Sequence, residues 1–312
     1  MNRVANRRAG IGATAVSFAA LMFGLNASTV KVILATGISP ELLVLFRATF
    51  TSVVAGFILL LTNRKAFKVA KKDIPLLIVY GIIGIAMMQW SYSNAVSRLP
   101  IAVALLIEYT AIVIVPLVAL ILFKEKIKAR LWVGIAAVLV GLGIVSNIWD
   151  SHLDPIGVAW AVMAAICVSV YFLIGEHTQR KRDAMSTLFY TFAIAAVFWA
   201  IINMINPSKI PDINKIVSLS GNLAYVMWPT WVALVWLGIM GSFVPMLLDY
   251  IALGNLSATA VGIIATSETV FASAFAWIWL GESMTTLGVI GGLIVITGII
   301  LAETSRTNTL KA

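Results

Sequence analysis

The chain has 312 residues, of which 61% are hydrophobic and only 11% are charged, and its mean hydropathy is +1.01. These values lie far outside the balance of soluble domains, so the composition predicts an integral membrane protein and leaves no room for a soluble domain of useful size. The net charge of +9 comes from basic residues that gather in a few short loops, which argues against a nucleic-acid partner.

The first predicted element is a membrane helix close to the start of the sequence. The stretch MNRVANRRAGIGATAVSFAALMF opens with basic residues and continues into an apolar run, so it resembles a signal peptide. We expect an uncleaved helix instead, because the apolar stretch continues past residue 26 and no clear A-x-A-type cleavage site follows.

Apolar runs separated by glycine, proline and charged residues continue along almost the whole chain. A bilayer-spanning helix needs about 20 mostly apolar residues. We also expect a short interfacial helix in the long loop at residues 206–222. The pattern predicts an all-α membrane protein with ten transmembrane helices, at residues 12–36, 40–62, 74–96, 100–123, 129–148, 155–176, 185–206, 226–253, 257–280 and 286–303.

The basic residues predict an orientation for these spans. With the amino terminus in the cytoplasm, only Arg98, Lys209 and Lys215 fall in outside loops, and the positive-inside rule then places both termini in the cytoplasm. Tryptophans near the outer ends of spans fit an interfacial belt: Trp149, Trp160, Trp228, Trp231, Trp277 and Trp279. The cytoplasmic basic residues are Arg3, Arg7, Arg8, Arg64, Lys65, Lys68, Lys71, Lys72, Lys124, Lys126, Lys128, Arg130, Arg180, Lys181, Arg182, Arg306 and Lys311.

An internal repeat appears at an offset of 157 residues. The matched pairs follow one another without a gap: Gly81 and Gly238, Gly84 and Gly241, Ala95 and Ala252, Leu99 and Leu256, Glu125 and Glu282, Gly134 and Gly291, and Gly141 and Gly298. The first spans of each half match more weakly, with Gly12 and Gly157 as the anchor. We predict two five-helix repeats, at residues 1–150 and 151–312.

The second repeat is expected to be inverted, because each repeat has five spans and an odd number of crossings reverses the chain. The charges agree: the surroundings of Glu125, KEKIKAR, are basic and cytoplasmic, whereas those of Glu282, GESMTT, have no basic residue. Inverted repeats are typical of alternating-access transporters, which bind their substrate near the midplane.

With these features the sequence resembles the drug/metabolite transporter superfamily, EamA type. The resemblance rests on the inverted repeats, on FGLN at residues 23–26, on EYTA at residues 108–111 and on the helix-end acids of the repeat. It implies a bacterial inner-membrane protein that exports or exchanges small metabolites, amino acids among them. The family's usual proline after the EYTA-like segment is replaced by Ile112, and by Thr269 in the second half, so a kink in the first half would come from Pro116.

Glu108 is the first candidate for a substrate site. It lies about eight residues, or about 12 Å, into the fourth span, where an ionised carboxylate is costly unless it is paired or hydrated. Arg47 and Lys31 lie at a similar depth and could compensate it. One interpretation is a water-filled substrate site, which intramembrane acids favour, and the other is a structural ion pair.

Other polar residues within the spans could share this cavity. Gln89 and Tyr92 are three residues apart on one helix face, and Asp249 is the repeat counterpart of Tyr92. Glu268 lies near the middle of the ninth span. The substrate-binding candidates are Glu108, Gln89, Tyr92, Arg47, Asp249 and Glu268, with Asn26 and Tyr171 of lower weight.

No pattern in the sequence predicts catalysis, a cofactor or a metal. There is no nucleophile with a neighbouring base and no phosphate-cradling loop, so we expect neither an enzyme nor an ATP-driven pump. His152 and His177 lack ligand-like spacing, and Cys167 is expected to be a packing residue. Glu125, Glu176 and Glu282 stand at helix ends, where capping is expected. Glycines crowd the fifth and tenth spans and favour close packing within one chain, while both a monomer and a homodimer remain open.

The sequence therefore predicts a secondary transporter, and export is the expected direction. The cargo would be a small polar metabolite such as an amino acid or amine, moved by alternating access of the two repeats around a midplane cavity. Protons are a second candidate partner, because buried acids can take them up. The alternatives are an importer or exchanger of a sugar- or phosphate-linked metabolite, and a membrane sensor that does not transport. Acids outnumber bases among the candidates, which argues against an anionic cargo.

Overall fold

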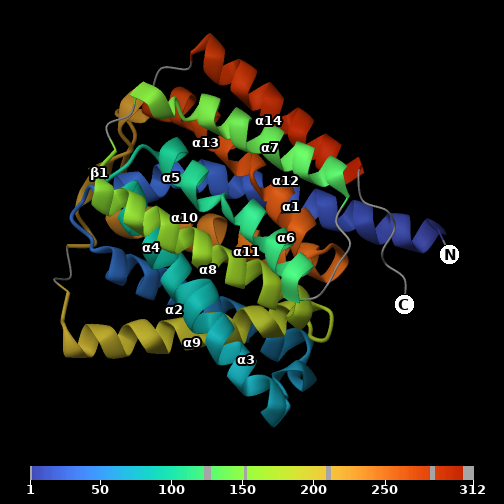
Figure 1. The fold of residues 1–312 in the computed structure, drawn as a ribbon. Helices are drawn as coiled ribbons and strands as arrows, with labels where there is room; N and C mark the ends of the chain where they lie inside the picture. The colour runs from blue at the N-terminus through green and yellow to red at the C-terminus, as the bar shows by residue number, and fades with distance from the viewer. Residues whose placement is uncertain (1, 123–127, 151–152, 209–211, 282–284, 305–312) are drawn as a thin grey trace.

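The computed structural model describes residues 2–122, 128–150, 153–208, 212–281 and 285–304, which form a helical bundle with one short hairpin (Figure 1). Eight apolar helical segments of at least 18 residues and two shorter ones, Ala129–Val145 and Thr286–Ala302, correspond to the ten expected spans. The prediction of an all-α membrane protein is confirmed.

Among the described residues of the first repeat there are seven α-helices, because two of its spans are divided. Short helices η1 (Arg64–Phe67), η2 (Lys71–Asp73) and η4 (Ile148–Asp150) lie in its loops, and the π-helix η3 (Tyr80–Met87) joins the two parts of the third span. The α-helices are α1 (Asn2–Leu34), α2 (Pro40–Thr62), α3 (Ile74–Val79), α4 (Met88–Val96), α5 (Ile101–Glu108), α6 (Ala111–Leu122) and α7 (Ala129–Val145).

The second repeat has the same plan. Its α-helices are α8 (Pro155–Gln179), α9 (Ala184–Ile205), α10 (Thr230–Gly238), α11 (Val244–Asn255), α12 (Ala258–Ala265), α13 (Ser267–Phe275) and α14 (Thr286–Thr304). The π-helices η6 (Ile239–Phe243) and η7 (Ala276–Leu280) interrupt the eighth and ninth spans. The remaining elements are η5 (Gly221–Leu223) and the strands β1 (Ile216–Ser218) and β2 (Met227–Pro229).

Cap residues explain where several spans begin. Ser39 and Asp154 precede a proline at the first helical position, and their side chains accept hydrogen bonds from the Leu42 and Ile156 amides. Asp183 caps α9 in the same way. These caps satisfy backbone donors of the first helical turn that have no partner within the helix.

The loop before the eighth span differs from its prediction. The span expected at 226–253 is present but begins at Thr230, because residues 227–229 form the second strand of an antiparallel hairpin in which Val217 pairs with Trp228. The hairpin strand β1 lies within residues 206–222, where an interfacial helix was expected. The hairpin is anchored on the bundle because the Trp279 indole donates to the Leu219 carbonyl at 2.7 Å. We call this side of the bundle the hairpin end.

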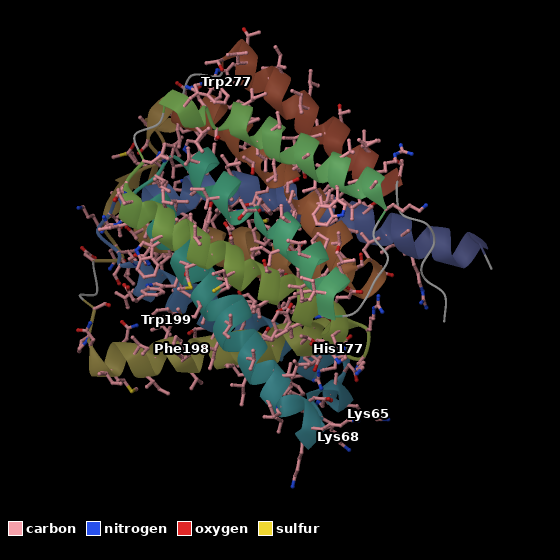
Figure 2. The ribbon with its side chains drawn as sticks, viewed as in Figure 1. Lys65, Lys68, His177, Phe198, Trp199 and Trp277 are labelled. Atoms are coloured by element: carbon pink, nitrogen blue, oxygen red, sulfur yellow. The ribbon has the colours of Figure 1, made fainter. Side chains whose placement is uncertain are left out.

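The opposite side carries η1, η2 and residues 180–183, and we call it the basic end. The first turns of α1 and the last turns of α14 lie on this side of the molecule in Figure 1, away from β1. Figure 2 labels Lys65, Lys68 and His177 on this side of the molecule. The exposed large apolar side chains between the two ends, such as Phe57, Leu61 and Ile201, form a surface suited to lipid.

The main contacts between helices follow the repeat: a contact made by a helix of one repeat has an equivalent contact made by its counterpart in the other repeat. α7 lies along α14 and α2 along α9, and each pair joins counterpart spans (Figure 1). α1 packs on α11, α12 and α13, and the equivalent helix α8 packs on their counterparts α4, α5 and α6. The same symmetry holds between residues, because Gly12 packs against Leu256 while Gly157 packs against Leu99.

Counterpart helices run antiparallel, which is the signature of an inverted repeat. A Cβ added at Gly134 would lie 2.7 Å from the Ala302 Cβ, whereas one added further along α7 at Gly141 would lie 2.8 Å from the Gly291 carbonyl oxygen. Residue numbers thus rise along α7 while those of their contacts fall along α14. The repeats have opposite orientations, and their small residues permit this close packing.

Two counterpart spans are broken at the same repeat position. The fourth span is interrupted at Tyr109 and Thr110, and the ninth at Thr266. The Thr110 hydroxyl donates to the Ile107 carbonyl at 2.7 Å, and its counterpart Ser267 donates to the Ile264 carbonyl, also at 2.7 Å. The expected source of a kink, Pro116, lies within α6 instead, so local hydroxyl bonds rather than proline mark these breaks.

Candidate functional site

A cavity of about 720 Å³, counted with the space that opens to solvent, lies between the two repeats. The structure brings all eight candidate residues to its wall: Asn26, Arg47, Gln89, Tyr92, Glu108, Tyr171, Asp249 and Glu268.

The two broken spans place acids in the middle of the bundle. Glu108 is the last residue of α5, directly before one break, and Glu268 is in the first turn of α13, directly after the other. Each of these residues is at most 9% exposed. The free backbone N–H groups at the start of α13 favour an anion at Glu268, whereas Glu108 lies at the carbonyl end of α5.

Tyr109 supports Glu268 and was missed by the sequence reasoning. Its hydroxyl donates to Glu268 Oε2 at 2.6 Å across the seam between the repeats. The signal that could have found it is its position, because it follows Glu108 directly in EYTA and is the first residue of the break.

Arg47 is fixed by the second repeat. Its Nε donates to Ser242 Oγ at 2.7 Å and its Nη2 to the Gly241 carbonyl at 2.8 Å. Both partners belong to the π-helix η6, a type of element that often occurs at functional sites. Arg47 also interacts electrostatically with Glu268. The two hydrogen bonds that the structure gives Arg47 therefore go to η6 rather than to Glu108, the partner considered from the sequence.

Several buried polar atoms of the cavity have no hydrogen-bond partner among the described residues. They include both amide atoms of Gln89, the hydroxyl of Tyr92, Oδ1 of Asn26 and Oδ1 of Asp249. Buried polar atoms in proteins are nearly always paired. This wall of the cavity is therefore suited to a polar guest rather than to an apolar one.

Asn26 also has a packing role. Its Nδ2 donates to the Met22 carbonyl at 2.6 Å and to the Met240 carbonyl of η6 at 2.7 Å. A Cβ added at Gly241 would lie 3.1 Å from the Asn26 amide carbon and oxygen. Asn26 thus holds α1 against the π-helix that also binds Arg47.

A layer of aromatic rings lies beside Asp249. The ring centroids of Tyr80 are 5.6 Å from those of Tyr171 and Tyr250, and Asp249 Oδ2 accepts a long hydrogen bond of 3.4 Å from the Tyr171 hydroxyl. Thr191 and Tyr250 are joined through their hydroxyls at 2.9 Å. We call Tyr80, Tyr171 and Tyr250 the tyrosine layer.

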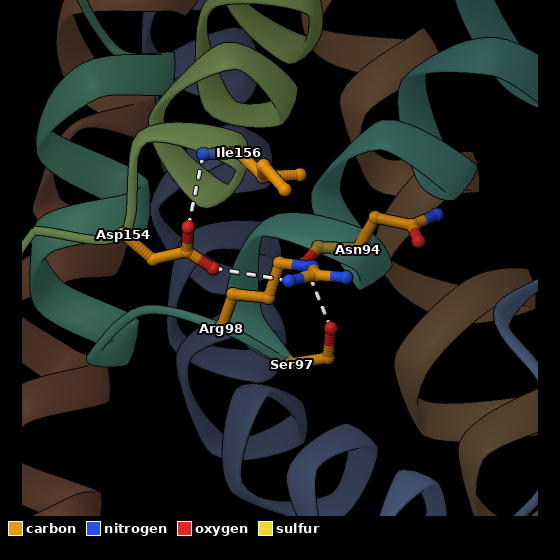
Figure 3. A network of polar contacts seen from close by, with 5 residues as sticks. All are labelled: Asn94, Ser97, Arg98, Asp154 and Ile156. Carbon is orange, nitrogen blue, oxygen red and sulfur yellow. Dashed lines mark hydrogen bonds and ion pairs between the residues drawn. The ribbon is translucent and has the colours of Figure 1, made fainter.

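Polar contacts lie beyond both ends of the cavity, between the two repeats at the hairpin end and within the second repeat at the basic end. At the hairpin end, Arg98 from the end of α4 donates to Asp154 Oδ2 at 3.1 Å, and Asp154 Oδ1 accepts from the Ile156 amide of α8 (Figure 3). The hydrogen bond from Arg98 lowers the pKa of Asp154 below its ordinary value. At the basic end, Glu176 Oε2 accepts from the Ala258 amide at 2.6 Å.

The predictions for the three glutamates at helix ends can be compared with the structure in one case. Glu176 is at a helix end as expected, and its bond to Ala258 caps the start of α12. Glu125 and Glu282 lie outside the described residues. In the part of the chain that the structure describes, no group of three or more His, Cys, Asp or Glu side chains is arranged to hold a metal ion.

Comparisons with known proteins agree with this architecture. The model of the EamA-like transporter family matches residues 10–147 and 155–304. The uncharacterized transporter YdfC of Bacillus subtilis (strain 168) is 25% identical over 286 residues, which cover 89% of this chain and 87% of YdfC. The threonine/homoserine exporter RhtA of Escherichia coli (strain K12) is 24% identical over 244 residues, or 78% of this chain and 74% of RhtA.

A solved protein structure has the same fold. It superposes with a TM-score of 0.73 at 17% sequence identity, covering 94% of this chain and 96% of the other. Both repeats match the family model, and the matches together span nearly the whole sequence. The chain therefore belongs to the EamA-like transporter family.

Proposed function

We propose that the protein is a secondary transporter that exports a small polar metabolite, an amino acid or an amine, by alternating access of its two repeats. The observation that carries this proposal is the cavity at the seam of the inverted repeats, lined by Glu108, Asp249, Glu268 and Arg47. Each repeat supplies charged groups to it, so a relative movement of the repeats changes the site and its access together.

The cargo class follows from the chemistry of the cavity wall. Three carboxyl groups and one guanidinium favour a guest with at least one cationic group, and the unpaired amide of Gln89 and hydroxyl of Tyr92 offer further hydrogen bonds. The relative RhtA is named an exporter of threonine and homoserine, which supports an amino acid and the outward direction. The excess of acids disfavours a phosphate-linked cargo.

The divided helices support movement at this site. Spans that break near the midplane form discontinuous helices, which are common at the substrate and ion sites of secondary transporters. We infer that the units of movement are the repeats at residues 1–150 and 151–312, in agreement with the separate family matches to each half. The driving force would be the gradient of the solute itself or of protons taken up by the cavity acids.

The location proposed is the bacterial inner membrane with the basic end in the cytoplasm. Arg64, Lys65, Lys68, Arg180 and Arg182 lie at that end, as the positive-inside rule requires of cytoplasmic loops. The partners are then the lipid bilayer, a small solute and protons, and the protein acts as a monomer or a homodimer.

Counterflow in proteoliposomes tests the transport function. The purified protein is reconstituted with an unlabelled amino acid inside, and uptake of the labelled compound is measured for a panel of amino acids and amines, with and without a pH gradient. We expect specific uptake, and we expect Glu108→Gln to reduce it without loss of folded protein. Uptake equal to that of empty liposomes for every compound would reject the transport function, and wild-type uptake by Glu108→Gln would remove Glu108 from the site.

A further inference from the structure

The charged groups of the cavity are arranged along the axis of the bundle rather than around one point. The Arg47 guanidinium is bonded to Ser242, which fixes its level on the eighth span. Asp249 lies seven residues further along the same span, which is about two helical turns, or about 10 Å at 1.5 Å per residue. Gly241, whose carbonyl also accepts a hydrogen bond from Arg47, and Asp249 both line the cavity, so the span faces the cavity at two levels.

Glu108 and Glu268 provide two carboxyl groups between these levels. Glu268 interacts electrostatically with Arg47 at one level and with Asp249 at the other, and Glu108 interacts with Glu268. From the hairpin end to the basic end, the cavity therefore presents a cation, a pair of acids and a third acid.

A short amino acid cannot contact all of these charged groups at once. The carboxylate, ammonium and hydroxyl groups of threonine sit on adjacent carbons, so a threonine held at Arg47 leaves Asp249 without a contact. In lysine, six bonds separate the carboxylate carbon from the side-chain nitrogen, about 7 Å when extended, and a charge-assisted hydrogen bond of about 2.8 Å at each end lengthens the reach beyond 10 Å.

We propose that the cargo is an α-amino acid with a cationic side chain, bound with its α-carboxylate at Arg47 and its side-chain cation at Asp249. This inference rests on the proposed transport function. The α-ammonium group then lies beside Glu268 and Glu108, so one guanidinium and three carboxyl groups meet one carboxylate and two cations. Gln89 and Tyr92 complete the carboxylate site with their unpaired amide and hydroxyl.

The tyrosine layer suits a cation at the far level. The Tyr171 ring lines the cavity, and its hydroxyl is bonded to Asp249 Oδ2, which leaves Oδ1 unpaired at 5% exposure of the residue. Aromatic faces attract ammonium and guanidinium groups, most strongly where water is excluded.

The repeats differ at the positions that bind the carboxylate, so the cargo has one preferred orientation in the cavity. At the offset of 157 residues, the counterpart of Gln89 is Met246 and that of Tyr92 is Asp249. At the offset of 145 set by Gly12 and Gly157, the counterpart of Arg47 is Phe192. The carboxylate-binding groups of the site therefore have no copy at the basic level, and the cargo cannot bind equally well in the reversed direction.

Competition in the counterflow assay tests the proposal on the wild-type protein. Uptake of labelled lysine is measured against unlabelled ornithine, threonine, norleucine and cadaverine. We expect ornithine to compete at least about tenfold better than threonine and norleucine, which lack the distal cation, and better than cadaverine, which lacks the carboxylate. Because this comparison needs no variant, a folding defect cannot obscure it.

Two substitutions test which residue binds each end of the cargo. Asp249→Asn should weaken competition by ornithine about tenfold and leave competition by norleucine unchanged. Arg47→Gln should weaken competition by both ornithine and norleucine and leave competition by cadaverine unchanged. Asp212→Asn, in the exposed loop before β1, is the matched control. If threonine competes as well as ornithine, or Asp249→Asn weakens norleucine equally, the inference is wrong while amino-acid transport stands. If no compound is taken up at all, the proposed function itself fails.

Discussion

The contact between α7 and α14 provides a sharp test of the inverted packing. A Cβ added at Gly141 would lie 2.8 Å from the Val295 amide nitrogen and 2.8 Å from the Gly291 carbonyl oxygen, and these backbone atoms can move only if the helices separate. Gly143 lies two residues further on the same helix and has nothing within 4 Å of an added Cβ. Gly141→Ala and Gly143→Ala therefore make the same chemical change in two different surroundings.

The expected difference follows from two opposing effects. Alanine is favoured over glycine in a helix interior by about 1 kcal/mol, and both variants gain this. Overpacking of a close interface costs about 1–3 kcal/mol, and only Gly141→Ala incurs it. Gly143→Ala should therefore unfold at the wild-type temperature or above it, and Gly141→Ala should fall below Gly143→Ala by about 1–3 kcal/mol in free energy of unfolding.

The symmetry of the repeats adds a third variant. The repeat relation converts the contact of Gly141 with Gly291 into the contact of Gly298 with Gly134, where an added Cβ would lie 2.9 Å from the Gly134 carbonyl oxygen. Gly298→Ala should therefore be as destabilised as Gly141→Ala. Unfolding is followed by tryptophan fluorescence in one detergent for all three proteins. Equal stability of Gly141→Ala and Gly143→Ala would refute the close antiparallel packing of α7 against α14.

Two further predictions concern the closures of the cavity. Asp154→Asn keeps the helix cap but removes the ion pair with Arg98; because that pair lowers the folded-state pKa of Asp154, its contribution is present above the ordinary value of 3.8 and is lost as the pH falls below it. The thermal stability of Asp154→Asn should therefore trail the wild type at neutral pH and converge with it on acidification, and a constant gap would contradict the role of Asp154. Tyr80→Ala should open the tyrosine layer. In a protein that carries Cys167→Ala and the reporter Asp249→Cys, a water-soluble maleimide should then label the reporter faster when Tyr80→Ala is added than when Tyr80→Phe is added. Equal labelling rates would show that the layer is no barrier.

The spans and the cavity residues were predictable because the hydrocarbon core penalises polar groups strongly. Glu108, Asp249 and Glu268 stand out from apolar sequence for that reason, and the structure places all of them at one cavity. The repeat was readable because Gly134 and Gly141 recur as Gly291 and Gly298, and these glycines do meet across α7 and α14.

Features set by contacts between distant segments were not predictable. Arg47 was considered as a partner of Glu108, but its hydrogen bonds cross to Ser242 and Gly241, which are 195 and 194 residues away in sequence. The hairpin was missed because Trp228 reads as the start of a span until Val217 is known to pair with it. A tertiary partner decides both cases, and sequence periodicity carries no information about such partners.

The backbone of the two repeats is more symmetric than their side chains, and this difference bears on how the proposed carrier would work. Both repeats contain a π-helix in the third of their five spans and a break near the midplane, so the backbone allows either end to open by the same kind of movement. The side chains at the two ends differ, because three tyrosines pack together beside Asp249. Their repeat counterparts towards the hairpin end are Leu237, Asn26 and Ser93. In a carrier with symmetric hinges, the free-energy difference between the two open states must come from groups that the repeats do not share. The tyrosine layer and the bond between Arg98 and Asp154 are such groups, so substitutions there should change which state is populated, whereas substitutions at the glycines of α7 and α14 should change the stability of both states alike.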